Sequence, residues 1–169
     1  MNAKHIDLKP YMGDSGMFPE LDALRGIDLS RRNGKFLFEK SGSGGYGAFC
    51  GGQEIPIGCV CGRLHIAGFS FWGGHAGNVE LCFRGEAEKE SVELYFWDWC
   101  NPYRHSEQIY EDDFKRAKEM PRVLFMYDIS GGKACVYHKT YRFPKHRFLE
   151  SIKLPDNYFL VIQAVTAEQ

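Results

Sequence analysis

Residues 79–100 read V-E-L-C-F-R-G-E-A-E-K-E-S-V-E-L-Y-F-W-D-W-C, which is two segments of alternating apolar and polar residues around a polar loop. Successive side chains of a β-strand point to opposite faces, so this pattern predicts an antiparallel β-hairpin. One face of the hairpin carries six apolar side chains that we expect to share one core: Val79, Leu81, Phe83, Val92, Leu94 and Phe96.

The other face of the second strand is unusually aromatic. Three rings are predicted to lie on it, those of Tyr95, Trp97 and Trp99. Aromatic side chains in a row supply contact area for a protein partner or stack on sugar rings. The competing interpretation is that a helix predicted at residues 106–120 covers this face, because two exposed tryptophans would make a large apolar patch.

The rest of the chain also favours strands. They are expected to begin at residues 36–38, to form two short segments within 55–72 with a bend near Gly68, and to follow at 122–129, 134–143 and 158–165. The last of these is apolar on both faces, which predicts a central position in the sheet. The spacing at 106–120 predicts one helix, and short helices are expected near 18–26 and 144–154.

The predicted fold class is therefore α+β and mainly β. We expect an antiparallel sheet or β-sandwich of about seven strands, with one inserted helix at about 106–120 and short terminal helical turns. The chain is predicted to form one globular domain, residues 1–169, whose segment 1–32 is less regular.

The charge balance disfavours a polyanionic partner. The chain has 21 Lys and Arg residues against 22 Asp and Glu residues, a formal charge of −1, so no overall field would attract nucleic acid. A basic and aromatic run at residues 139–147 is the local candidate, but a solvated strand edge explains it equally well. We expect no nucleic-acid partner.

The apolar residues are not grouped as in targeting or membrane segments. No signal-peptide run opens the chain, and nowhere do about 18 apolar residues occur together. We therefore expect a soluble cytoplasmic protein without a membrane partner. In that compartment the six cysteines are predicted to be mostly reduced thiols.

Several potential metal ligands lie close in sequence. Cys59, Cys61 and His65, followed by His75 and Cys82, include the atom types of a zinc site. Structural zinc sites use pairs of C-x₂₋₄-C knuckles, however, and only one closely spaced cysteine pair occurs here. We expect ordinary thiols in a strand, with no metal and no cofactor.

Cys50 and His75 form the candidate active site. Glycines surround Cys50, and their backbone N–H groups would be open to an oxyanion, while His75 precedes a strand. No Lys or Arg nearby in sequence would lower the pKa of the Cys50 thiol, so activation would require an imidazole brought close by the fold. The alternative is a glycine loop and a turn histidine without contact.

One acidic residue interrupts the alternation of apolar and polar residues in the 79–100 hairpin. Asp98 falls on the apolar side of its strand, where an unpaired carboxylate is costly. We expect it to pair with Arg104 or to cap the turn that follows.

These observations favour a small, intracellular, non-catalytic protein-binding domain, such as an inhibitor or an immunity-type factor. One alternative is a cysteine-dependent hydrolase or transferase that uses Cys50 and His75. Another is a glycan-binding β-sandwich that uses Tyr95, Trp97 and Trp99. The oligomeric state is left open.

Overall fold

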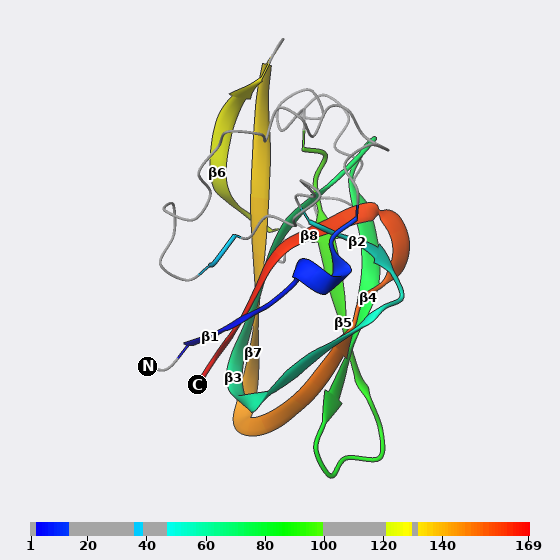
Figure 1. The fold of residues 1–169 in the computed structure, drawn as a ribbon, viewed down its shortest axis with the longest axis vertical. Helices are drawn as coiled ribbons and strands as arrows, with labels where there is room; N and C mark the ends of the chain where they lie inside the picture. The colour runs from blue at the N-terminus through cyan, green and yellow to red at the C-terminus, as the bar shows by residue number, and fades with distance from the viewer. Residues whose placement is uncertain (1–2, 14–35, 39–46, 100–120, 130–131) are drawn as a thin grey trace.

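The computed structural model describes residues 3–13, 36–38, 47–99, 121–129 and 132–169. Within these residues the chain forms one antiparallel sheet of eight strands and a single 3-10 turn, η1 (Lys9–Tyr11) (Figure 1). The strands are β1 (Ala3–Ile6), β2 (Ala48–Gly51), β3 (Glu54–Ser70), β4 (His75–Phe83), β5 (Glu90–Phe96), β6 (Arg122–Ile129), β7 (Gly132–Lys153) and β8 (Asp156–Glu168).

The sheet order is β1-β8-β3-β7-β4-β5, with β2 also paired to β8 and β6 also paired to β7. The mainly antiparallel β prediction is confirmed. The helices predicted at 106–120 and 18–26 lie outside the described residues. The helix predicted at 144–154 is wrong, because residues 149–153 of β7 pair with β3 on one side and with β4 on the other.

The β4–β5 hairpin has the predicted register. Val79 lies opposite Val92, and Gly77 lies opposite Leu94. This register places Val92 and Leu94 on the predicted inner face of the hairpin. The Leu94 side chain is fully buried, while Glu93 is exposed. Five of the six expected core residues are buried, and Val92 is half-buried and packs against the core.

The two longest strands, β3 and β7, join the parts of the sheet. They pair along most of their length and curve, as Figure 1 shows for β7 in orange. β3 is one strand instead of the two short ones predicted, and its pairing with β8 shifts between Ala67 and Gly68. A Cβ at Gly68 would lie 2.0 Å from the carbonyl oxygen of Val161, so only glycine fits this close approach.

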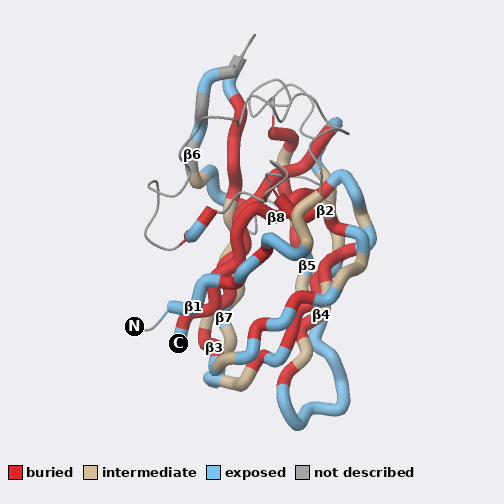
Figure 2. The backbone as a smooth tube through the Cα atoms, in the orientation of Figure 1, coloured by how far each residue is buried: buried red, intermediate tan, exposed pale blue. Residues whose placement is uncertain are grey.

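Buried residues from the described strands form a single apolar core. Figure 2 shows buried residues along β3, β7 and β8, whereas the loop between β4 and β5 is exposed. β8 pairs with β3 on one side and with β1 and β2 on the other, which confirms its predicted central position. The β6–β7 hairpin is also confirmed, with Ile129 opposite Gly132.

Two N-terminal predictions need correction. Residues 3–6 form β1, although the sequence there has little alternation. They are a strand because they pair with the C-terminal end of β8. Phe36 and Phe38 are buried but lie in no strand. The Phe36 ring instead contacts the rings of His65 and His138, so burial and not strand pairing explains its apolar character.

Among the described residues, no helix is long and apolar enough to cross a membrane.

Candidate functional site

The predicted aromatic face is divided between two environments. Tyr95 and Trp97 are half-buried and meet edge to face, with ring centroids 5.3 Å apart. Trp99 is only 3% exposed and packs in the core against Phe69 and Phe71. The prediction that Trp99 shares a face with Tyr95 and Trp97 is therefore wrong.

The physical reason is that β5 ends at Phe96, after which the chain joins the end of β3. The Ser70 N–H donates to the Trp97 carbonyl at 3.1 Å, and the Trp99 N–H donates to the Ser70 carbonyl at 2.9 Å. Asp98 forms a parallel bridge with Ser70. This new pairing interrupts the alternation of β5 and turns Trp99 into the core.

The same bridge holds the turn between β3 and β4, residues 71–74. The Asp98 carboxylate accepts a hydrogen bond from the Gly73 N–H at 2.6 Å, and the Ser70 hydroxyl donates to the Gly73 carbonyl at 2.6 Å. Asp98 therefore stabilises the turn before β4. The turn after its own strand, which Asp98 was predicted to cap, lies outside the described residues. Arg104, its other expected partner, lies outside the described residues.

Trp72 lies in this turn with its side chain in solvent. It is 73% exposed, and its backbone φ of 55° is in the left-handed region. It is the only non-glycine residue in the described part of the chain with a positive φ. The next residue, Gly73, also has a positive φ. The strand segments predicted within 55–72 extended as far as Trp72, whereas β3 ends at Ser70. Because a turn residue belongs to no strand face, alternation could not identify Trp72 as an exposed ring.

Three rings on the surface form what we call the aromatic stack: Trp72, Phe159 and His75. The Trp72 and Phe159 centroids are 5.8 Å apart, and the His75 and Phe159 rings are stacked at 4.6 Å with an interplanar angle of 19°. Phe159 on β8 is itself partly exposed. The Nε2 atom of His75 is buried without a hydrogen-bond partner.

Cys50 and His75 lie in environments that differ from those of an activated pair. Cys50 is fully buried in β2, not in a glycine loop, and burial raises the pKa of its thiol. A nucleophilic cysteine requires the opposite shift, toward the thiolate. Since His75 Nε2 has no hydrogen-bond partner and its ring stacks on Phe159, it does not hold the Cys50 thiol through that atom.

Two of the residues considered as metal ligands, His65 and Cys61, are engaged in other hydrogen bonds. His65 bonds Thr140 through Nδ1 and Glu168 through Nε2, each at 2.9 Å, and the Cys61 thiol donates to the Arg63 carbonyl. In the described ranges no group of three or more His, Cys, Asp or Glu residues could hold a metal ion. The five described cysteines are free thiols, as expected for reduced residues: Cys50, Cys59, Cys61, Cys82 and Cys135.

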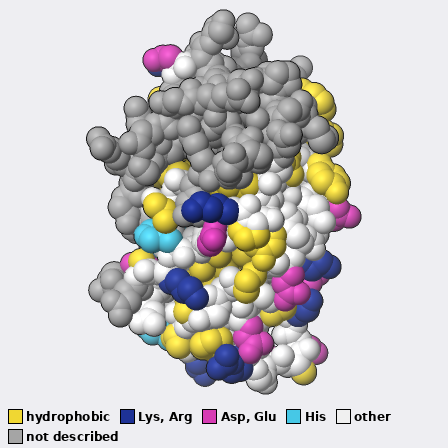
Figure 3. All heavy atoms as spheres, viewed as in Figure 1, with side chains coloured by type: hydrophobic (Ala, Val, Ile, Leu, Met, Phe, Trp, Pro, Cys, Tyr) yellow, Lys and Arg dark blue, Asp and Glu magenta, His cyan; other side chains and the backbone are white. Residues whose placement is uncertain are grey.

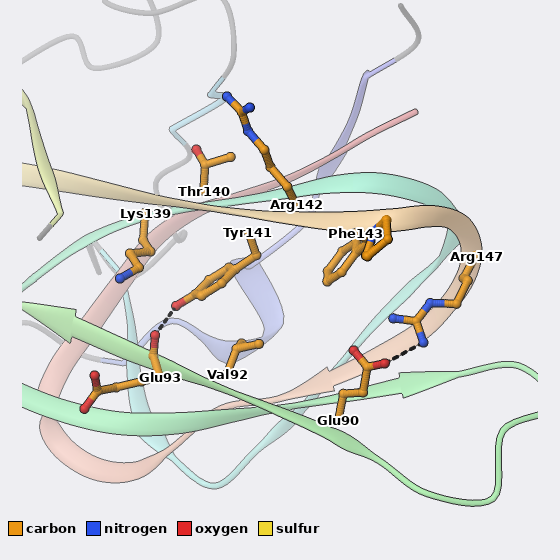
Figure 4. A pocket seen from close by; sticks show the side chains of 10 residues that line it. Glu90, Val92, Glu93, Lys139, Thr140, Tyr141, Arg142, Phe143 and Arg147 are labelled. Atoms are coloured by element: carbon orange, nitrogen blue, oxygen red, sulfur yellow. Dashed lines mark hydrogen bonds and ion pairs between the residues drawn. The ribbon is translucent and has the colours of Figure 1, made fainter. Parts of the chain in front are cut away.

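A groove of about 660 Å³ lies between β5 and the middle of β7. Val92, Tyr141 and Phe143 supply its apolar lining (Figure 4), which explains why Val92 stays half-buried. The Tyr141 hydroxyl donates to the Glu93 carbonyl at 2.7 Å and joins the two walls.

This groove includes much of the basic run at 139–147. Arg147 forms ion pairs with Glu86 at 2.9 Å and Glu90 at 2.6 Å, and its guanidinium lies 3.6 Å from the Phe83 ring centroid. The hydrogen bond from Arg147 lowers the pKa of Glu90. Because two carboxylates surround Arg147, the run is not a uniformly basic patch. On the face in Figure 3, acidic and basic side chains also lie near each other.

No protein-family model matches the chain, and no curated protein shows significant similarity to it.

Proposed function

We propose that this chain is a non-catalytic protein-binding domain and that Trp72 is the residue that anchors its partner. The observation that carries the proposal is the conformation of the Trp72 turn. A large side chain is held in solvent on a left-handed backbone, and such a conformation costs about 1 to 3 kcal/mol. Glycine would adopt it without this cost.

The turn is built to maintain that conformation. The buried Asp98 carboxylate and the Ser70 hydroxyl both bind Gly73, the residue next to Trp72. The turn is thus fixed before a partner arrives, and little conformational entropy is lost on binding. Tryptophan is among the residues that most often dominate protein–protein affinity.

The neighbouring side chains suit a protein partner. Phe159 and His75 extend the apolar surface beside Trp72, and the partner would bury this stack in an apolar pocket. Tyr95 lies against the same turn, because a Cβ at Gly74 would be 2.1 Å from its hydroxyl. Tyr95 and Trp97 are therefore proposed to support the turn rather than to form the main contact.

The test begins with an aromatic photo-crosslinking amino acid at position 159, beside Trp72, which leaves the proposed anchor in place and identifies the partner in cells. Binding of the purified partner is then measured for the native chain, Trp72→Ala and Tyr158→Ala. Tyr158 is the matched control, since it is an exposed aromatic outside the aromatic stack. We expect Trp72→Ala to weaken binding about 30-fold or more, and Tyr158→Ala to change it less than about threefold.

Two results would overturn the proposal. One is an unchanged affinity in Trp72→Ala. The other is a glycan ligand whose binding depends on Tyr95 and Trp97 but not on Trp72, which would favour the glycan-binding alternative. A rapid reaction of Cys50 with iodoacetamide at pH 6.5, abolished by His75→Ala, would favour the cysteine-enzyme alternative.

A further inference from the structure

A row of charged residues crosses the sheet at Arg63, in the middle of β3 and away from the Trp72 turn that follows the end of this strand. Arg63 on β3 lies directly opposite Arg142 on β7, and on its other side directly opposite Glu168 on β8. Residues in direct register on one face have Cβ atoms about 5 Å apart. Like charges at such positions destabilise a sheet, so an anion bound between the two arginines would relieve their repulsion.

The anion present in the row is already shared. Glu168 Oε2 lies 2.9 Å from His65 Nε2 and 3.5 Å from the Arg63 guanidinium. His65 is buried, and its other ring nitrogen contacts Thr140. The fixed His65 ring therefore holds the Glu168 carboxylate in position. Glu168 thus orients Arg63 but compensates only part of the charge of the two arginines.

Arg142 has no such partner. In the described part of the chain it makes no hydrogen bond or ion pair, and its side chain is exposed. Figure 4 shows Arg142 and Thr140 on the side of β7 opposite to Tyr141, and the register places Arg142 directly beside Arg63. The Arg63 side chain, 39% exposed, is also accessible to a ligand.

We propose that Arg63 and Arg142 together bind a phosphate group, either free phosphate or a small phosphate ester. A guanidinium presents a planar fork of N–H donors that matches the oxygens of phosphate or carboxylate. A carboxylate has two oxygens and fits one fork, whereas a tetrahedral phosphate has enough oxygens to accept from two forks on adjacent strands. This site is independent of the proposed protein-binding function, because it includes no residue of the aromatic stack.

The experiment is an NMR titration of the arginine Nε–H signals with inorganic phosphate and, in a second arm, with phenyl phosphate. Sodium chloride holds the ionic strength constant. We expect saturable shifts at millimolar phosphate for Arg63 and Arg142. Tighter binding of phenyl phosphate would identify an ester as the preferred ligand, and equal or weaker binding would identify the free anion.

Variants separate this site from general charge effects. Arg142→Gln and Arg63→Gln are each expected to weaken phosphate binding about tenfold or more, since each removes a charged donor. Arg84→Gln is the matched control, because Arg84 is exposed and paired with Glu150 at 3.0 Å. Its phosphate affinity should change less than about twofold. Melting temperatures of all variants establish that they are folded.

The proposal is overturned if the shifts follow ionic strength alone, or if Arg142→Gln, while folded, retains the native phosphate affinity.

Discussion

Trp72 and Trp99 both lie next to the bridge between Ser70 and Asp98, yet their side chains have opposite environments. Trp99 is 3% exposed and packs against Phe69 and Phe71, whereas Trp72 is 73% exposed. Both are held through the end of β3: the Trp99 N–H donates to Ser70, and the Trp72 turn is bound by Asp98 and Ser70.

Residue type alone therefore did not decide which tryptophan is exposed. The strand pattern placed Trp99 on the same face as Tyr95 and Trp97, either as a binding surface or covered by the predicted helix. A change of backbone pairing after Phe96 instead turned Trp99 into the core. Substitutions at these two tryptophans and at nearby core and groove positions test this contrast.

Trp99→Ala should destabilise the fold by about 3 to 5 kcal/mol, because it leaves a large cavity between two phenylalanine rings. Urea denaturation followed by circular dichroism measures this change. A loss below about 1 kcal/mol would mean that Trp99 is not a core residue, and the contrast with Trp72 would disappear.

Leu94→Ala should cost about 2 to 5 kcal/mol, because Leu94 is fully buried on the inner face of β5. Val92→Ala on the same face should cost about 1 kcal/mol, since Val92 is only half-buried beside the groove. Equal losses in the two variants, measured by the same denaturation, would contradict the described groove.

Alkaline pH extends the comparison to buried thiols. Burial raises the pKa of Cys61 from 9.0 to about 11. The unfolded chain therefore loses this proton first, and the free energy of unfolding should fall between about pH 9 and pH 11, by up to about 1.4 kcal/mol per pH unit. Burial also raises the pKa of Cys50 and of Tyr137, which acts in the same direction.

The control for this pH dependence is Cys61→Ala, whose stability should fall less steeply over the same range. Urea denaturation at several pH values measures both proteins. A native stability that is constant or rises between about pH 9 and pH 11 would contradict the assigned burial.

Trp72→Ala should change stability by less than about 1 kcal/mol, because the side chain is exposed. Trp72→Gly should be more stable than Trp72→Ala by about 1 kcal/mol, since glycine adopts the φ of 55° without a steric penalty. Thermal denaturation compares the two variants. If the alanine variant is the more stable, the turn is not strained and the main support for Trp72 as an anchor is lost.

The sequence by itself predicted a mainly antiparallel β protein, the β4–β5 and β6–β7 hairpins and the central strand β8. Strand alternation and turn residues are local signals, and they were sufficient for these elements. They were not sufficient for residues 144–154, where a short helix was predicted but pairing of residues 149–153 with two neighbouring strands forms part of β7 instead.

The positions of the candidate sites depend on contacts between strands that are distant in sequence. Trp72 became exposed and Trp99 buried because the chain after β5 pairs with β3, a contact between residues distant in sequence. Likewise, Arg63 and Arg142 are 79 positions apart in the chain, yet strand register places them side by side. Local pattern specifies which residues form strands, but the register between strands specifies which side chains meet, and that register depends on the whole fold.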